Sequence, residues 1–138
     1  VLITPNSERF TAAKERGESV EDILRSEPLL LREEGSGSQK CVDDFFRAAG
    51  IDKALLHVTA RMNDQESVKN LVAGGLGVSV VSRKAVESEK ETGRLLVFPL
   101  PNDCGARDLY LVQPREDVID LQAGRFAAFV RDFYRAER

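Results

Sequence analysis

The sequence predicts an α/β protein with an open, mostly parallel sheet flanked by helices on both sides. Segments with strand character alternate with segments of helical spacing along the 138 residues. PLLLR at 28–32 is apolar without interruption, as expected of a strand buried on both faces. A hydrophobic share of 42% and a charged share of 31% are typical of a globular domain.

The signals before this uninterrupted strand are weaker. VLI at 1–3 predicts the end of a strand, residues 4–7 predict a turn, and residues 8–18 predict a loop or a loose helix. Ser19 is placed to cap a short helix that leads to the strand at 28–32.

Two more helices and a strand are expected after that strand. The EEGSGS turn precedes a helix that Gly50 ends, and LHVTARM at 56–62 alternates as a half-buried strand does. Asn63 or Asp64 is expected to cap the next helix. The apolar residues on the inner faces of these two helices are Cys41, Val42, Phe45, Phe46, Ala49, Val68, Leu71 and Val72.

The glycines of LVAGGLGVSVVS at 71–82 separate a helix from a strand. A dinucleotide-binding loop has its glycines after a strand and before a helix, so that phosphate meets the helix N-terminus. Here helical spacing precedes the glycines and β-branched residues follow them. We therefore expect Gly74 and Gly75 to end a helix, and Gly77 to begin a buried strand in close contact with its neighbours.

The last part of the chain predicts a helix, two strands and a long terminal helix. Ser82 caps a helix containing Ala85 and Val86. Strands are expected at 94–100 and 107–112, with a turn between them at 101–103. A helix at 118–135 then carries an apolar stripe of Ile119, Ala123, Phe126, Ala127, Val130, Phe133 and Tyr134.

Charge and cysteine content exclude several classes of protein. The net charge is −3 and no basic stripe is present, so this segment is a poor nucleic-acid binder. Two cysteines and one histidine are too few for a disulfide framework or a metal site, and no cofactor is expected. The sequence contains neither an apolar run of the roughly 18 residues that a membrane helix needs nor a signal-peptide pattern. Because the chain begins with Val1 rather than Met and opens in mid-strand, we expect a fragment of a longer protein. The low cysteine content favours a cytoplasmic protein.

Three motifs in order resemble the effector-binding domain of LysR-type transcriptional regulators. SVKNLVAGGLGVSVVSRKAV at 67–86 is similar to the family's helix, LVxxGxG segment, short strand and new helix. LLLREEGSGSQKCVDDFFRAAGI at 29–51 resembles its strand, Gly-Ser-Gly turn and helix. VLITP, GRLLVFPL, RDLYLV and the Phe-rich terminal helix stand in the expected order, so the resemblance covers nearly the whole chain.

The resemblance implies a type II periplasmic-binding-protein-like fold, in which crossing strands join two α/β lobes around a small effector. Residues 1–4 would be a crossing strand from the first lobe, 5–100 the second lobe, and 101–138 the return strand and a helix docking on the first lobe. The earlier part of the first lobe would lie outside the chain. So would an N-terminal helix-turn-helix, through which a dimeric or tetrameric regulator contacts DNA.

Strand-to-helix junctions are the expected ligand contacts, because ligands of open α/β sheets bind beyond the carboxyl ends of the strands. Hydroxyls and amides beside helix N-termini suit a carboxylate, sulfate or phosphate, so the effector is expected to be a small anion. The resemblance singles out the position nine residues before Val72. The candidate effector contacts are Asn63, Ser36, Gly37, Ser38, Asp64 and Ser82.

Plain structural roles compete with these assignments. Asn63 with Glu66 forms an ordinary capping box, and Ser38 and Ser82 are suitable caps. Asp64 repels an anion, which favours a cap or a contact to a cationic group. Arg32 and Arg61 either meet an acidic ligand or bridge to glutamates.

Three functions remain open from the sequence. They are a ligand sensor of a transcription regulator, an enzyme or periplasmic solute-binding protein on the same two-lobe fold, and an oligomerisation module using Phe45–Phe46 or Phe126–Phe133. We favour the sensor and expect no catalysis, because no triad and no general base beside a nucleophile is found. The aromatic residues are better explained as core.

Overall fold

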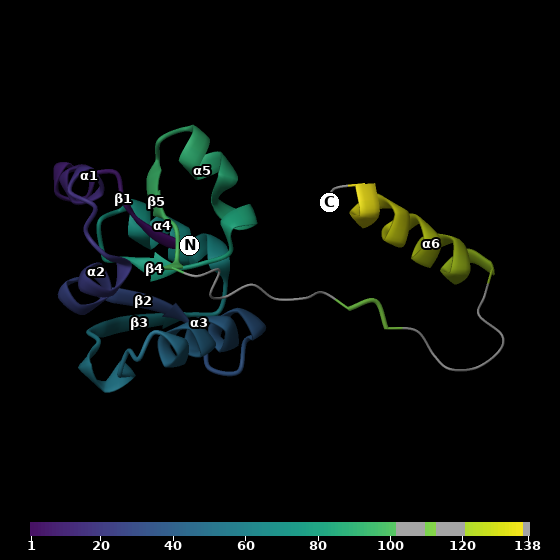
Figure 1. Ribbon diagram of the computed structural model, residues 1–138, viewed down its shortest axis with the longest axis horizontal. Helices are drawn as coiled ribbons and strands as arrows, with labels where there is room; N and C mark the ends of the chain where they lie inside the picture. Colours follow the sequence, from purple (N-terminus) through teal and green to yellow (C-terminus); the bar gives the residue numbers. More distant parts are fainter. Residues whose placement is uncertain (102–109, 113–120, 137–138) are drawn as a thin grey trace. The chain divides into compact units, whose positions relative to one another are not determined.

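A computed structural model describes residues 1–101, 110–112 and 121–136 of the chain (Figure 1). The chain divides into two compact units, Val1–Ala106 and Arg107–Arg138. The first unit contains every strand that the structure describes, and the second contains one described helix, α6 (Leu121–Ala136). Each unit is described by itself.

The elements of the first unit alternate between strands and helices. Its strands are β1 (Leu2–Pro5), β2 (Leu29–Arg32), β3 (Val58–Met62), β4 (Ser79–Val80) and β5 (Leu95–Phe98). Its helices are α1 (Glu8–Glu15), α2 (Val20–Ser26), α3 (Gly37–Ala48), α4 (Gln65–Ala73) and α5 (Glu87–Glu91), with short 3₁₀ turns η1 (Lys53–Leu55) and η2 (Arg83–Val86).

The strands lie in the order β3-β2-β4-β1-β5. β2 pairs with β3 in parallel, and β1 pairs antiparallel with both β4 and β5. Two backbone hydrogen bonds join these ladders: Leu30 N donates to Val78 O at 2.9 Å, and Val78 N donates to Pro28 O at 2.8 Å. Since Leu29 and Val78 bridge in parallel, β1 alone runs against the other four described strands. The expectation of a mostly parallel sheet is confirmed, with one reversed strand.

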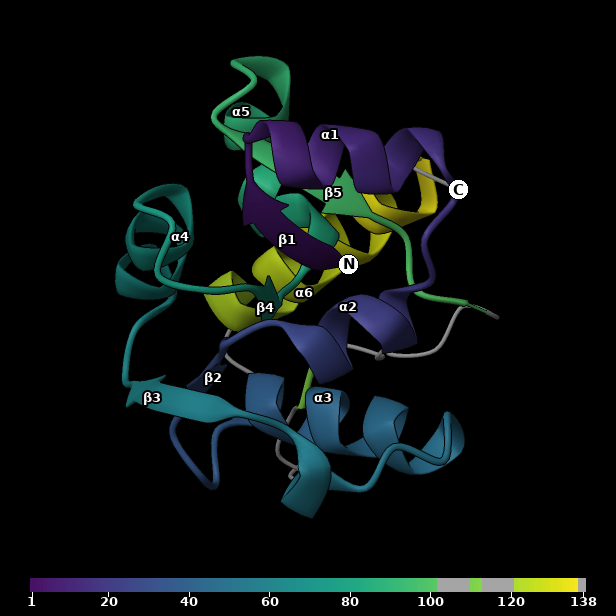
Figure 2. The same ribbon diagram turned by 90° about the vertical axis from the view of Figure 1, so that its left-hand side faces the viewer.

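Helices cover both faces of the sheet, as the uninterrupted apolar strand predicted. Successive strand residues face opposite sides. Leu29 and Leu31 join a core that includes Phe46 of α3 and residues of α1 and α2. Leu30, between them, joins a second core with Val72 of α4. Figure 2 shows α4 on one side of the strands and α1, α2 and α3 on the other.

Several boundaries differ from the sequence-based expectation. The uncertain segment at 8–18 contains a regular helix, α1, and Thr4 and Pro5 belong to β1 rather than to the following turn. The helix expected after Ser82 is a single 3₁₀ turn followed by α5. The strand expected at 107–112 lies partly outside the described residues, and its described part, residues 110–112, is not a strand.

One edge of the sheet gathers the carboxyl ends of four strands, and we call it the carboxyl edge. β2, β3, β4 and β5 all end there because they run the same way. The start of β1 lies there too, since Leu2 pairs with both Val80 and Phe98. The chain therefore enters the sheet through β1 and leaves it after β5 at the same edge.

Candidate functional site

The first junction of the carboxyl edge joins β2 to α3. Ser36 is the N-cap of α3, and its Oγ accepts a hydrogen bond from Gln39 N at 3.1 Å. This bond satisfies one of the free N–H groups of the first turn. Gly37 and Ser38 are the first residues of the helix, so the expectation that Ser38 is the cap is wrong, and Ser36 has that role.

The second junction joins β3 to α4, and here two neighbouring residues competed for the cap. Asp64 is the N-cap, and its Oδ1 accepts from Ser67 N at 2.7 Å. Hydrogen bonds from the Ser67 side chain and backbone lower the pKa of the Asp64 carboxyl, as a capping role requires. The predicted capping box of Asn63 and Glu66 is therefore wrong.

Because Asp64 caps α4, the side chain of Asn63 is not used as a cap. It is exposed, and its backbone oxygen accepts from Arg32 Nη2 at 2.9 Å. The structure gives its side-chain amide no hydrogen bond to any described residue. The structural explanation that competed with a ligand role for Asn63 is thereby removed.

Two arginines hold the ends of β2 and β3 together. Arg32 Nε lies 2.8 Å from a Glu33 carboxylate oxygen, while Nη2 of the same residue reaches Asn63 O across the strands. Arg61 Nη1 donates to Arg32 O at 3.1 Å, and its Nη2 lies 3.5 Å from Glu34. The bridges to glutamates that competed with a ligand role for these arginines are thus present.

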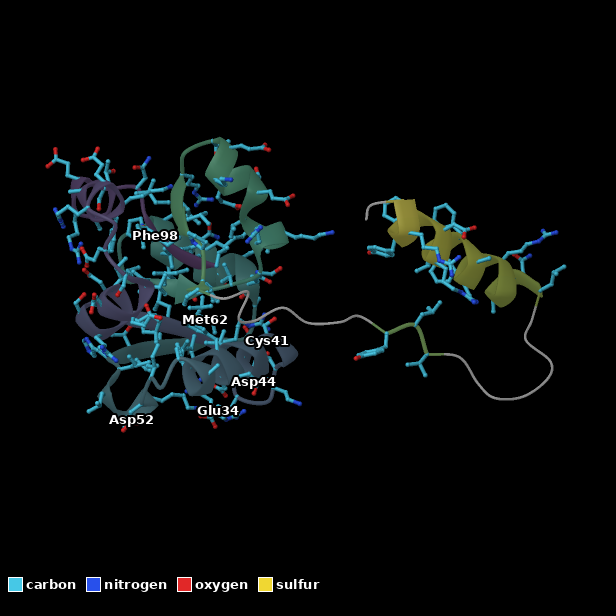
Figure 3. All side chains as sticks on the ribbon, in the orientation of Figure 1. Glu34, Cys41, Asp44, Asp52, Met62 and Phe98 are labelled. Atoms are coloured by element: carbon cyan, nitrogen blue, oxygen red, sulfur yellow. The ribbon has the colours of Figure 1, made fainter. Side chains whose placement is uncertain are left out.

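The two ends of the β3 segment can be followed in Figure 3. Met62 marks its carboxyl end beside the Asn63 junction, and Asp52 lies before η1 on the way to its amino end. Ser36 and Asn63 therefore follow neighbouring strands at the same edge.

The third junction follows β4, which lies on the other side of β2. Ser82 is exposed and precedes η2, but its side chain makes no capping hydrogen bond. Its assignment as a cap by side-chain hydrogen bonding is wrong. The sheet order brings Ser36, Asn63 and Ser82 to one edge, as predicted, since the three strands before them are parallel.

A buried lysine, which sequence reasoning did not single out, supports this third junction. Only 7% of the Lys69 side chain is exposed, and its Nζ donates to Ala85 O of η2 at 3.0 Å. Nζ also lies 2.7 Å from the half-buried Glu89 and 2.8 Å from the exposed Glu66. Burial acts to lower the pKa of Lys69, but the hydrogen bonds to both carboxylates outweigh it and raise the pKa. The ammonium thus fixes η2 against α4.

A hollow of about 410 Å³ lies elsewhere on the first unit. It is lined by Asn6, Ser7, Glu8, Thr11, Ala12 and Glu15, at the start of α1. Asn6 Nδ2 reaches Gly93 O, just before β5, which places this hollow at the edge opposite the carboxyl edge. Its two glutamates make it unsuited to an anion.

Neither a metal-ligand cluster nor a membrane-spanning helix occurs in the described part of the chain. Residues 1–101, 110–112 and 121–136 contain no cluster of three or more histidine, cysteine, aspartate or glutamate side chains that would hold a metal ion. Within these ranges, no helix has both the length and the apolar character needed to cross a bilayer. Cys41 is half-buried on α3 and forms no disulfide with any described residue, and Cys104 lies outside the described residues.

An α/β unit with polar strand ends at the edge where the chain enters and leaves defines a ligand-binding lobe of the type II periplasmic-binding-protein kind. The family model described as the LysR substrate binding domain matches residues 1–135, and the chain belongs to this family. The chain is therefore from the effector-binding domain of LysR-type transcriptional regulators, and the resemblance seen in the sequence is confirmed.

Curated relatives extend well beyond this chain. A RuBisCO operon transcriptional regulator of Allochromatium vinosum is 37% identical over 107 residues, which cover 78% of this chain and 34% of the relative. The HTH-type transcriptional activator CmpR of Synechocystis sp. is 26% identical over 129 residues, which cover 94% of this chain and 41% of the relative. The chain thus spans about a third to two fifths of these proteins.

Solved structures show the same fold. The regulatory domain of Synechocystis PCC6803 CcmR in complex with 2-PG matches with a TM-score of 0.74 and 22% identity, covering 94% of this chain and 59% of that one. The cofactor-binding domain of the Cbl transcriptional regulator matches with a TM-score of 0.51 and 24% identity, over 69% of this chain and 39% of that one. These likenesses confirm the predicted fold class.

Proposed function

We propose that the carboxyl edge of the first unit binds a small anionic effector through Asn63, with Ser36, Gly37, Ser38 and Ser82 around it. The observation that carries this proposal is the position of Asn63. Its amide is exposed and unpaired with any described residue, at an edge where parallel strands end beside the entering and leaving chain. Ligands of open α/β sheets bind in this position. Asp64 is left out of the contacts because its charge repels an anion and its oxygen already caps α4.

The same edge is where a companion lobe would meet this one. Residues 1–4 and the segment after β5 stand next to each other there, as two crossings between lobes require. Residues 5–100 then form the second lobe, and 101–138 return to the first lobe, with α6 docking on it. Effector binding between the lobes would favour one arrangement over another and so change DNA binding by a helix-turn-helix of the longer protein. Such a regulator would act in the cytoplasm as a dimer or tetramer.

A role without catalysis fits the placement of the histidine. His57, the one histidine of the sequence, is exposed and precedes the first residue of β3. It therefore lies at the opposite edge from the serines of the carboxyl edge. A Ser–His pair, which needs hydrogen-bond distance, is not formed by these residues.

A thermal-shift screen of the full-length regulator tests this function. Small organic acids, amino acids and inorganic anions are added, and a bound effector raises the unfolding temperature by mass action. In Asn63→Ala the shift should disappear, while the free protein keeps its stability within about 0.5 kcal/mol because Asn63 is not the cap.

Asn70→Ala is the matched control for this screen. Asn70 is an exposed amide of the same helix, α4, and its Oδ1 binds Arg94 Nη2 at 2.8 Å, away from the carboxyl edge. This variant should retain the ligand shift. A shift that survives Asn63→Ala unchanged would exclude Asn63 as an effector contact.

A further inference from the structure

Three arginines stand at the carboxyl edge, and two of them are already engaged. Arg32 is bound to Glu33 and to the backbone oxygens of Met62 and Asn63. Arg61 is bound to Arg32 O and paired with Glu34. These guanidinium groups are held by the ends of β2 and β3 and have their charge balanced within the lobe.

The third, Arg83, differs from both. It is exposed at the start of η2, and the structure shows no hydrogen bond or ion pair between its guanidinium and any described residue. Its backbone position is well defined, because Val81 N donates to Val1 O and Val1 N donates to Val81 O, each at 2.9 Å. Because Val81 pairs with Val1 in this way, Arg83 follows two residues after the backbone contact with the start of β1.

The segment that carries Arg83 is held rigidly on its other side. Lys69 Nζ donates to Ala85 O, two residues after Arg83, and the same ammonium is held by the half-buried Glu89. A side chain on a fixed backbone loses less freedom when it binds a ligand. Arg83 is therefore presented at the edge by two sets of contacts that do not use its own charge.

We propose that Arg83 selects the charge of the effector by binding its oxyanion, a carboxylate or a phosphate, at the carboxyl edge. This inference rests on the proposed function and adds the residue that would discriminate anions from neutral molecules. A guanidinium offers paired N–H donors that match both kinds of oxyanion. Lys40, on the first turn of α3, is not placed for this role, since it shares the outward face of that helix with Asp44 and Arg47 while Val42 and Phe46 face the core.

Calorimetric titration of the full-length regulator with 2-PG, malate and inorganic phosphate tests the inference. Arg83→Gln should weaken binding of the anion that the wild type prefers by roughly tenfold to a hundredfold, the effect of losing hydrogen bonds to a charged group. Arg83→Lys keeps the positive charge but loses the paired N–H donors, so its affinity should lie between those of the wild type and Arg83→Gln. The phosphate and carboxylate probes show which oxyanion is taken.

Arg25→Gln is the matched control. Arg25 is an exposed arginine of α2, and the helix leads into the amino end of β2, at the opposite edge. Its removal changes the net charge equally and should change affinity less than twofold. Equal losses of affinity in Arg25→Gln and Arg83→Gln would show a general effect of net charge and overturn the role proposed for Arg83.

The outcomes separate this inference from the function on which it rests. Binding that Asn63→Ala removes and Arg83→Gln leaves intact would overturn the role of Arg83 while supporting the edge as the effector site. A wild type that binds neutral or cationic molecules there, but none of the three anions, would overturn both the role of Arg83 and the anionic nature of the effector, while keeping the edge as the binding site. A wild type that binds neither these anions nor any compound of the screen would overturn both.

Discussion

Gly77 shows how one residue without a side chain connects two strands. Its φ of +151° lies in a region that side chains disfavour, and a Cβ built on it would collide with the carbonyl of Pro28. That carbonyl accepts the hydrogen bond from Val78 N that joins β4 to β2. The sequence predicted this close contact, because a glycine stood between a helix and an apolar β-branched run.

Gly77→Ala should therefore destabilise the chain by about 2–4 kcal/mol, from backbone strain together with the forced separation of β4 and β2. The comparison is Gly75→Ala, where φ is +80° but nothing lies within 4 Å of the added Cβ. That change should cost about 1 kcal/mol, from conformation alone. Urea unfolding of both variants measures the difference, and equal losses would contradict the role of the Pro28 contact.

The sequence alone does not decide which residue caps α4. Asn63 and Asp64 are adjacent, and both residue types cap helices well, so the sequence does not separate them. What separates them is the backbone turn after Met62, which brings Asp64 Oδ1 to Ser67 N. Arg83 was missed for a similar reason. That Arg83 has no partner among the described residues becomes visible only by comparison with the contacts of Arg32 and Arg61.

Between elements, the Lys69 network joins α4 to η2 and α5. Its ammonium meets two carboxylates of contrasting exposure, with 12% of the Glu89 side chain exposed against 73% of Glu66. The sequence signals the Glu66 contact through its i,i+3 spacing. Glu89 lies 20 residues along the chain from Lys69, and only the packed fold brings the two together.

Glu89→Gln should cost about 1.5–3 kcal/mol at neutral pH, as expected for a hydrogen bond to a buried charge, whereas Glu66→Gln should cost about 0.2–1 kcal/mol. The hydrogen bond from Lys69 lowers the pKa of Glu89 below its ordinary 4.5. The stabilisation from Glu89 is therefore full above pH 4.5 and is lost as the pH falls through the lowered, folded-state pKa.

Urea unfolding of the wild type and both variants between pH 3 and pH 7 is the corresponding measurement. The difference in free energy of unfolding between the wild type and Glu89→Gln should become smaller as the pH falls below 4.5. A difference that stays constant down to pH 3 would contradict the role of the Glu89 carboxylate. So would an equal loss of unfolding free energy in Glu66→Gln.

At the scale of the whole molecule, the sheet order was only partly predictable. Alternation of apolar strands and helices predicted parallel neighbours, and β2, β3, β4 and β5 fit this pattern. The reversed β1 did not follow from the pattern of VLI, because direction is set by where the chain enters the sheet and not by side-chain period. The resemblance implied that residues 1–4 cross from the first lobe, but it did not give the direction of this strand in the sheet.

The aromatic residues of the terminal helix, expected to be core, are not covered within the second unit. Large apolar side chains of α6 are exposed, with 61% of Phe126, 66% of Phe129 and 50% of Phe133 accessible. The Phe129 and Phe133 rings contact each other at 6.3 Å between centroids. By contrast, Phe45 and Phe46 of α3 are 1% exposed and confirm the prediction made for them. An aromatic face of this extent is expected to need a covering surface.

Hydrogen exchange tests whether that surface is the companion lobe, as proposed for residues 101–138. A helix of 16 residues is marginally stable in water without packing, so α6 amides should exchange fast in the isolated chain 1–138 and slowly in the full-length regulator. Phe129→Ser with Phe133→Ser should remove the protection, whereas Arg125→Ser, a change at an exposed polar residue of the same helix, should preserve it. Amides of α3, which packs within the first unit, should be protected in both proteins. If α6 exchanges equally fast in both, its aromatic face is not covered by the rest of the regulator, and the proposed docking is wrong.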